Sequence, residues 1–143
     1  MKAVGRLTGK VAACKVALGK DLLEAVEELR AEAGIMEGQV EMIGALRRAV
    51  LGFYDQQKRE YKTLEFNRPL EIVSGIGNIS LKDGKPFAHI HLAVSDEEGK
   101  CFGGHLMPGT EVFAGEIFIR ETEMAPPLKR DYDEATGLYL WTK

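Results

Sequence analysis

One helical segment in a chain otherwise made of β-type segments is the feature that most constrains the fold. Asp21 is a typical helix N-cap, Glu24 completes a capping-box pattern, and Gly34 is a typical stop. Apolar residues recur at helical spacing between them, which predicts an amphipathic helix over residues 22–33. The other apolar segments are separated by turn residues and predict strands near 11–18, 38–44, 47–54, 61–66, 70–81, 86–94, 100–107 and 111–121.

One principal helix among many strands predicts the α+β class, as a mainly antiparallel sheet in a compact single domain. The 143 residues include 45% hydrophobic and 29% charged side chains, which is typical of one globular domain. A domain of this size buries roughly two-thirds of its unfolded surface, so it can fold without disulfides or a structural metal. We expect a single domain over 1–143, with its core at about 4–123 and a tail over 124–143 that packs on the body or on a neighbouring subunit.

Charge and cysteine content narrow the classes of partner and compartment. The net charge is −3 and basic residues are never clustered beyond adjacent pairs, which is a poor match to a nucleic-acid surface. Two cysteines are too few for a secreted disulfide framework and favour a reducing compartment. No apolar run approaches the ~20 residues that span a bilayer. The sequence therefore predicts a cytoplasmic protein that is not embedded in a membrane.

The three histidines of the chain are close together in the sequence, and strand register brings them closer in space. His89 and His91 point to the same side of a strand because side chains alternate between faces. Residues 96–100 fit a three-residue hairpin loop with Gly99 in the left-handed region. That loop pairs the two strands so that His105 lies directly opposite His91.

The same register is supported by the opposite face of the hairpin. It sets Val94 against Phe102 and makes that face uniformly apolar, whereas a slip of one residue would mix the two faces. A second two-residue turn at 83–84 then places Asn78 opposite His89. An amide side chain therefore joins the histidine face.

Three neutral imidazoles so placed, roughly 5 to 7 Å apart at their β-carbons, can converge on one divalent ion. Zn²⁺ matches this ligand set best, and Ni²⁺, Co²⁺ or Fe²⁺ match it less selectively. No fourth protein ligand is evident, so water or a small ligand would complete the shell. The alternative is that His89 and His91 form a solvent-facing or hydrogen-bonded pair. Asn78 is a candidate for a supporting group behind the ligands. Glu71 is a candidate for the same role or for a general base, the alternative being a structural hydrogen bond.

The chain contains, in this order, Gly19-Lys-Asp-Leu-Leu-Glu-Ala, Ile43-Gly-Ala-Leu, Gly52-Phe-Tyr-Asp, the segment from Pro69 to Ser80, His89-Ile-His-Leu and Gly103-Gly-His-Leu-Met-Pro-Gly. Together these segments resemble the Plants and Prokaryotes Conserved (PPC) domain over about residues 4–123. The resemblance implies a compact α+β domain that assembles as a homotrimer. It also implies a metal, commonly zinc, at the positions that are His89, His91 and His105 here.

The resemblance bears on DNA binding as well. Prokaryotic members are often described as DNA-binding, and plant members carry an AT-hook with an Arg-Gly-Arg-Pro core that enters the minor groove. This chain contains no such core. Because the hook carries DNA binding in the plant proteins, we expect weak DNA binding without sequence preference here.

Three classes of function stay open at this point. The first is a homotrimeric metal-binding protein with an open three-histidine zinc site, acting on a small-molecule ligand as an enzyme or a sensor. The second is a DNA-associated regulator of transcription, and a scaffold that recruits a partner protein is a third possibility. In the second class, basic residues of three copies would form a rim, the candidates being Arg6, Arg47, Arg48, Lys58, Arg59 and Lys62.

Overall fold

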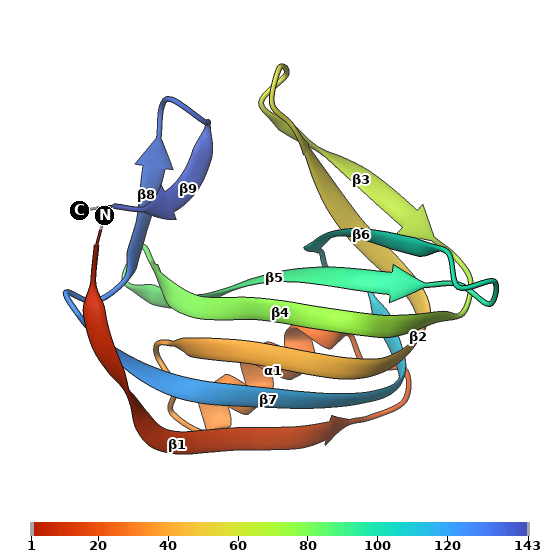
Figure 1. The fold of residues 1–143 in the computed structure, drawn as a ribbon, viewed down its shortest axis with the longest axis horizontal. Helices are drawn as coiled ribbons and strands as arrows, with labels where there is room; N and C mark the ends of the chain where they lie inside the picture. The colour runs from red at the N-terminus through yellow and green to blue at the C-terminus, as the bar shows by residue number, and fades with distance from the viewer. Residues whose placement is uncertain (1, 143) are drawn as a thin grey trace.

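The computed structural model describes residues 2–142 and is rich in strands, with one short helix in that range (Figure 1). This composition is consistent with the predicted α+β class. The elements in chain order are β1 (Val4–Val16), α1 (Leu22–Glu32), β2 (Gly38–Asp55), β3 (Glu60–Phe66), β4 (Leu70–Lys82), β5 (Lys85–Ser95), β6 (Cys101–Leu106), β7 (Glu111–Ala125), β8 (Lys129–Asp133) and β9 (Leu138–Trp141).

The long strand β2 organises the sheet. Its first part pairs with β7 on one side and β4 on the other, and its second part pairs with β3 and, at Leu51 and Gly52, with β6. Because β4 also pairs with β5 and β5 with β6, the strands β2, β4, β5 and β6 form a closed ring of pairings. The pairings are antiparallel, as predicted, except that β8 joins β4 in parallel.

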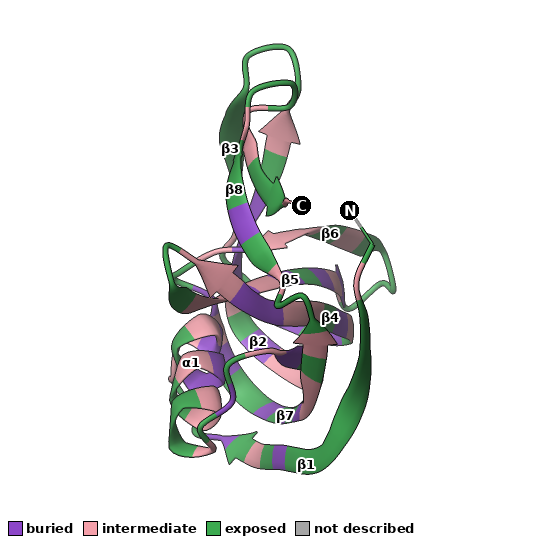
Figure 2. Cartoon of the chain, turned by 90° about the vertical axis from the view of Figure 1, so that its left-hand side faces the viewer, coloured by how far each residue is buried: buried purple, intermediate pink, exposed green. Residues whose placement is uncertain are grey.

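The core lies between one face of the sheet and α1 (Figure 2). Val40 and Ile119 pair across β2 and β7, and both are fully buried in a cluster that includes Val26 of the helix. The opposite sheet face is open, and on it large apolar side chains such as Ile76 and Phe118 are exposed. No helix within residues 2–142 is long and apolar enough to cross a membrane.

Helix α1 begins where the sequence predicts. Asp21 Oδ1 accepts hydrogen bonds from the backbone N–H groups of Leu23 and Glu24, at 2.9 and 3.1 Å, which satisfies two donors at the first turn. Asp21 Oδ2 accepts a further bond from Gly109 N, at 2.6 Å, so the cap also fixes the loop before β7. The helix ends at Glu32, one residue before the predicted boundary, and Gly34 follows with φ of 65°.

The main error in the sequence interpretation of the body concerns β2. The predicted strands 38–44 and 47–54 are one continuous strand. Gly44 adopts φ of 144°, and a Cβ at this position would collide with the backbone of Ala114, so glycine here bends the strand without ending it. The predicted break at residues 45–46 follows this bend directly.

The C-terminal residues form a further hairpin, β8–β9, where the sequence indicated only a tail. Its first strand adds to the edge of the sheet, with Leu81 paired to Lys129 and Lys82 to Arg130. The indole Nε1 of Trp141 donates to Ser80 Oγ at 3.1 Å. The aromatic end of the tail is therefore packed on the body of its own chain.

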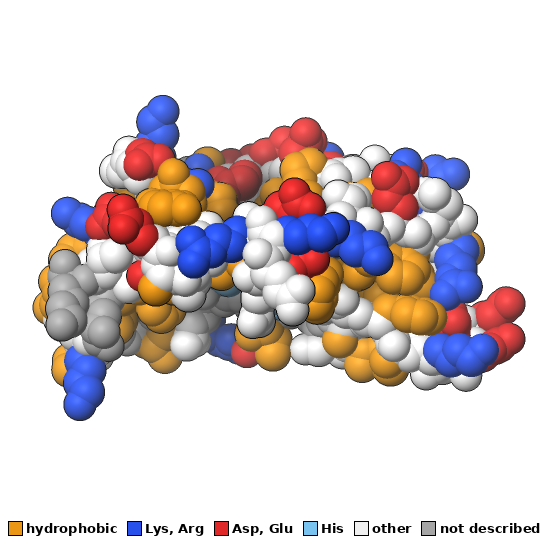
Figure 3. Space-filling model, turned by 90° about the horizontal axis from the view of Figure 1, so that it is seen from above, with side chains coloured by type: hydrophobic (Ala, Val, Ile, Leu, Met, Phe, Trp, Pro, Cys, Tyr) orange, Lys and Arg blue, Asp and Glu red, His pale blue; other side chains and the backbone are white. Residues whose placement is uncertain are grey.

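Charged side chains of both signs are interspersed on the surface. Three of the six basic residues considered for a DNA-binding rim are in ion pairs, Arg6 with Glu123, Arg47 with Glu111 and Arg48 with Glu65. Figure 3 shows acidic side chains beside the basic ones across the face seen from above. This surface offers no uniform basic area to a phosphate backbone on that face.

Candidate metal centre: three histidines in a cavity

The β5–β6 hairpin has the predicted register and brings the three histidines together. The loop closes through Asp96 N and Lys100 O at 3.1 Å, and Gly99 has φ of 76°. His91 is paired with His105 across the hairpin, and Asn78 of β4 is paired with His89. Local turn chemistry thus positions side chains that come from three strands.

The three imidazoles face one another at distances suited to a shared ion. One ring nitrogen of each histidine lies within 4.8 Å of the corresponding atoms of the other two. The Nε2 atoms of His89 and His91 are 3.2 Å apart. The centroid of the His105 ring lies 5.1 Å from that of His89 and 5.6 Å from that of His91. Among the described residues, no cysteine, aspartate or glutamate joins this group.

His105 lies beside Gly52 and the Tyr61 ring. Gly52 of β2 is paired with His105, and a Cβ at Gly52 would lie only 2.9 Å from the Tyr61 ring. The Tyr61 ring lies 5.2 Å from the His105 ring, centroid to centroid. His105 Nδ1 is buried and has no hydrogen-bond partner among the described residues. A buried nitrogen without a partner is unfavourable and is typical of a site that awaits a ligand or ion.

Burial and neighbouring charges favour the neutral form of His89 and His105. The pKa of His89 is lowered to about 4, chiefly by burial and then by the charge of Arg130. The pKa of His105 is also lowered, by burial and by His91 and Arg130. A neutral imidazole has a free lone pair for a metal, whereas a protonated ring has none. The donor set and its electrostatics therefore fit a divalent metal ion with nitrogen ligands.

Arg130 of β8 reaches into the same site, and sequence reasoning did not identify it. Its Nε donates to Ser80 Oγ at 2.8 Å and its Nη2 donates to Asn78 Oδ1 at 2.8 Å. The same Nη2 lies 3.3 Å from His89 Nδ1. Asn78 therefore contacts the site through Arg130. Nothing in the local sequence around residue 130 signals this role, because it depends on the pairing of β8 with β4.

The histidines and Arg130 line an open cavity of about 590 Å³. The hairpins β2–β3 and β8–β9 stand on the same side of the sheet and form its walls (Figure 1). The hairpins are joined by hydrogen bonds from Tyr54 Oη to Thr136 O at 2.8 Å and from Arg59 Nη1 to Glu134 O at 3.0 Å. The volume is in the range of small-molecule sites.

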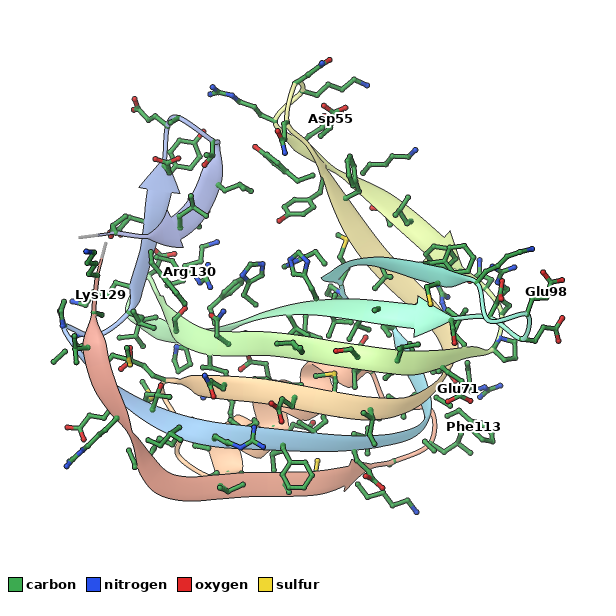
Figure 4. All side chains as sticks on the ribbon, viewed as in Figure 1. Asp55, Glu71, Glu98, Phe113, Lys129 and Arg130 are labelled. Atoms are coloured by element: carbon green, nitrogen blue, oxygen red, sulfur yellow. The ribbon has the colours of Figure 1, made fainter. Side chains whose placement is uncertain are left out.

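Glu71 does not belong to this site, which corrects the role expected for it. It is paired with Ser95 at the opposite end of β4, and it lines a different cavity together with Phe113. Figure 4 shows Glu71 and Arg130 at opposite ends of the sheet. Strict alternation from Asn78 would place Glu71 on the core face, but a register shift between Ile72 and Ser74 pairs it with Ser95 and brings it to the histidine face. Its position along the strand still separates it from the histidines.

Comparisons with known proteins agree on one family. The family model of the Plants and Prokaryotes Conserved (PCC) domain matches residues 5–123. A solved metal-containing protein from Archaeoglobus fulgidus is 44% identical over 100% of both chains, with a TM-score of 0.90. A plant- and prokaryote-conserved protein from Pyrococcus horikoshii is 36% identical over 98% of this chain and 95% of that chain, with a TM-score of 0.89.

Two further comparisons add functional descriptions of other proteins. A protein from Ralstonia eutropha whose description proposes DNA binding is 26% identical over 92% of this chain and 90% of that chain, with a TM-score of 0.76. The bifunctional protein GlmU of a Synechococcus strain is 32% identical over 120 residues, which are 83% of this chain. This chain spans only 18% of the length of that relative.

Proposed function

The chain belongs to the Plants and Prokaryotes Conserved domain family, and on that premise we propose that it is a metal-binding protein in which His89, His91 and His105 hold one divalent ion. The observation that carries the proposal is the convergence of three imidazoles in one cavity. The description of the Archaeoglobus fulgidus protein as metal-containing supports it, at 44% identity. Zn²⁺ is the preferred ion because it accepts three imidazoles in a tetrahedral site.

The proposed site is of the open type. Structural zinc sites have four protein ligands, whereas sites that act on ligands have three and leave a position for water or a small molecule. When bound, such an ion supplies Lewis-acid chemistry to an oxygen atom of a ligand. The chain itself holds the imidazoles in position through the hairpin and leaves the cavity accessible. A small-molecule enzyme or a ligand sensor would use this arrangement in the same way.

The test is metal content after zinc reconstitution, measured by elemental analysis. We expect about one zinc per wild-type chain and loss of most of it in His105→Ala, because two imidazoles hold the ion weakly. Glu71→Gln is the matched control and should keep its zinc, since Glu71 lies at the other end of β4. His105→Ala should still fold, as circular dichroism would report. Equal zinc in wild type and His105→Ala, or none in either, would contradict the proposal.

We also propose that the protein assembles as a homotrimer. The open sheet face supports this proposal, since apolar side chains lie exposed in a row of paired residues across it and no part of residues 2–142 covers them. Across that row Phe118 is paired with Glu41, Glu41 with Ile76, and Ile76 with His91. The proposed interface therefore continues the face on which the histidines lie.

A further inference from the structure

The guanidinium of Arg130 is a buried positive charge with no negative partner among the described residues. The residue is 5% exposed. Its hydrogen-bond acceptors are all neutral, namely Ser80, Asn78, His89 and the carbonyl of Tyr139. Within residues 2–142 no carboxylate forms an ion pair with it. Burying an uncompensated charge is costly, and proteins usually retain one only where a partner or ligand balances it.

The rest of the cavity has the character of a site for an organic anion. Lys82 and Arg59 also line it, against a single acidic side chain, Glu60. Its walls include the aromatic rings of Phe87 and Tyr139 and the aliphatic side chains of the β9 strand. A positively charged cavity with apolar walls favours a small molecule that has an apolar body and an anionic group.

We infer that this cavity binds a small organic anion whose carboxylate or phosphate group is received by Arg130, beside the three histidines. A guanidinium is suited to this task because it donates parallel hydrogen bonds to two oxygens of a carboxylate or phosphate. The inference deepens the proposed function. It rests on that function in one respect, because a second donor atom of the ligand would face the metal. It identifies the chemical class of the ligand and the residue that selects it.

The hydrogen bonds of Arg130 leave donors for such a ligand. Four contacts occupy four of its five N–H groups, so one N–H of Nη1 has no partner among the described residues. A second donor depends on His89. If His89 binds a metal through Nε2, its proton resides on Nδ1, which can no longer accept from Arg130. That N–H of Arg130 then becomes available to the anion.

The residue that selects the ligand comes from outside the matched part of the family. The family match ends at residue 123, whereas Arg130 lies in β8, and Tyr139 and Leu140 of β9 form part of the cavity wall. The histidines come from within the matched region. The C-terminal hairpin would therefore determine which ligand binds, while the conserved domain would supply the metal ligands.

Isothermal titration calorimetry of the full chain tests the inference with three probes, which are lactate, inorganic phosphate and the neutral lactamide. We expect lactate or phosphate to bind zinc-loaded wild type with a Kd below about 10 mM, at least about tenfold tighter than lactamide. Arg130→Met should weaken this binding by about tenfold or more. Lys129→Met removes one charge from the neighbouring, exposed residue and should change it less than about twofold. The anion that binds with the higher affinity shows whether the cavity prefers a carboxylate or a phosphate, and either preference supports the inference.

Two results would overturn it: equal affinity of wild type for the anions and for lactamide, or an equal loss of binding in Lys129→Met and Arg130→Met. Thermal melting checks that Arg130→Met is folded. If it is not, Arg130→Lys, which keeps the charge without the planar fork, replaces it and should also weaken binding. Titration of metal-free His105→Ala separates the two proposals. If this metal-free variant binds an anion through Arg130 while wild type holds no zinc, the metal site is contradicted and the anion site stands.

Discussion

His89 is the residue where the metal site and the C-terminal hairpin meet. One ring nitrogen faces His91 at 3.2 Å, and the other faces Arg130 at 3.3 Å. Because arginine only donates, His89 Nδ1 acts as acceptor in this arrangement and the Nε2 proton can be shared with His91. The position of one proton therefore links the histidine group to β8.

The lowered pKa of His89 predicts how the stability of the metal-free protein depends on pH. The unfolded chain takes up this proton near pH 6.5 and the folded chain only near pH 4, so the unfolded state binds more protons between these values. Stability should fall as the pH is lowered from about 6.5 to about 4. We expect a loss of roughly 1–2 kcal/mol, because partial exposure of the ring reduces the full effect.

Chemical denaturation of wild type and His89→Gln at several pH values checks this prediction. The difference in unfolding free energy between the two proteins should change across that pH interval, since the variant lacks the titrating ring. Parallel curves for wild type and variant would show that His89 is not responsible.

At the scale of elements, turns and caps decide the position of the site. The 83–84 turn sets the β4–β5 register, and its two residues both have positive φ, 52° at Asp83 and 73° at Gly84. The loop before β6 sets the β5–β6 register in the same way. Two short connections thus determine which residues of β4, β5 and β6 lie side by side.

Removing the N-cap of α1 should lower the stability of the protein measurably. Asp21→Ala removes acceptors for the N–H groups of Leu23, Glu24 and Gly109 and should cost about 1–2 kcal/mol. Asp21→Asn is the matched control and should lose less, because one side-chain oxygen still caps the helix. Urea denaturation at a fixed protein concentration measures both changes. If Asp21→Asn lost as much unfolding free energy as Asp21→Ala, a capping role would be contradicted.

At the scale of the whole molecule, the two faces of the sheet have different tasks. One face packs on α1 and forms the core, and the other bears both the histidines and the exposed apolar row. Phe118 is 45% exposed and Ile76 is 62% exposed in the single chain. Their exposure is costly in water and is relieved if further copies cover this face.

Phe118→Glu should therefore disrupt the proposed trimer. Sedimentation equilibrium should give three times the chain mass of 15.8 kDa for wild type and a value close to that of one chain for the variant. Leu18→Glu is the control, since Leu18 is 65% exposed in the loop before α1. Phe118→Glu should still bind zinc, because all three proposed ligands come from one chain. A wild-type protein with the mass of one chain would contradict the assembly.

The surface charge predicts weak and non-specific binding to double-stranded DNA. The net charge is −3, and half of the candidate rim residues are already paired with glutamates. A fluorescence anisotropy titration at physiological salt should show no submicromolar binding that survives competitor DNA. Such binding would favour the alternative function as a DNA-associated regulator.

The sequence alone determined the parts that depend on residues close together in the chain. The Asp21 cap, the 83–84 turn and the Gly99 loop are local, and they predicted the helix and the register that unites His89 with His105. Only the tertiary structure decided that Arg130 enters the site, because its partner Ser80 is 50 residues away and no local pattern encodes the pairing of β8 with β4. It also separated Glu71 from the histidines, since the register shift between Ile72 and Ser74 and the pairing of Glu71 with Ser95 arise only when β4 and β5 come together.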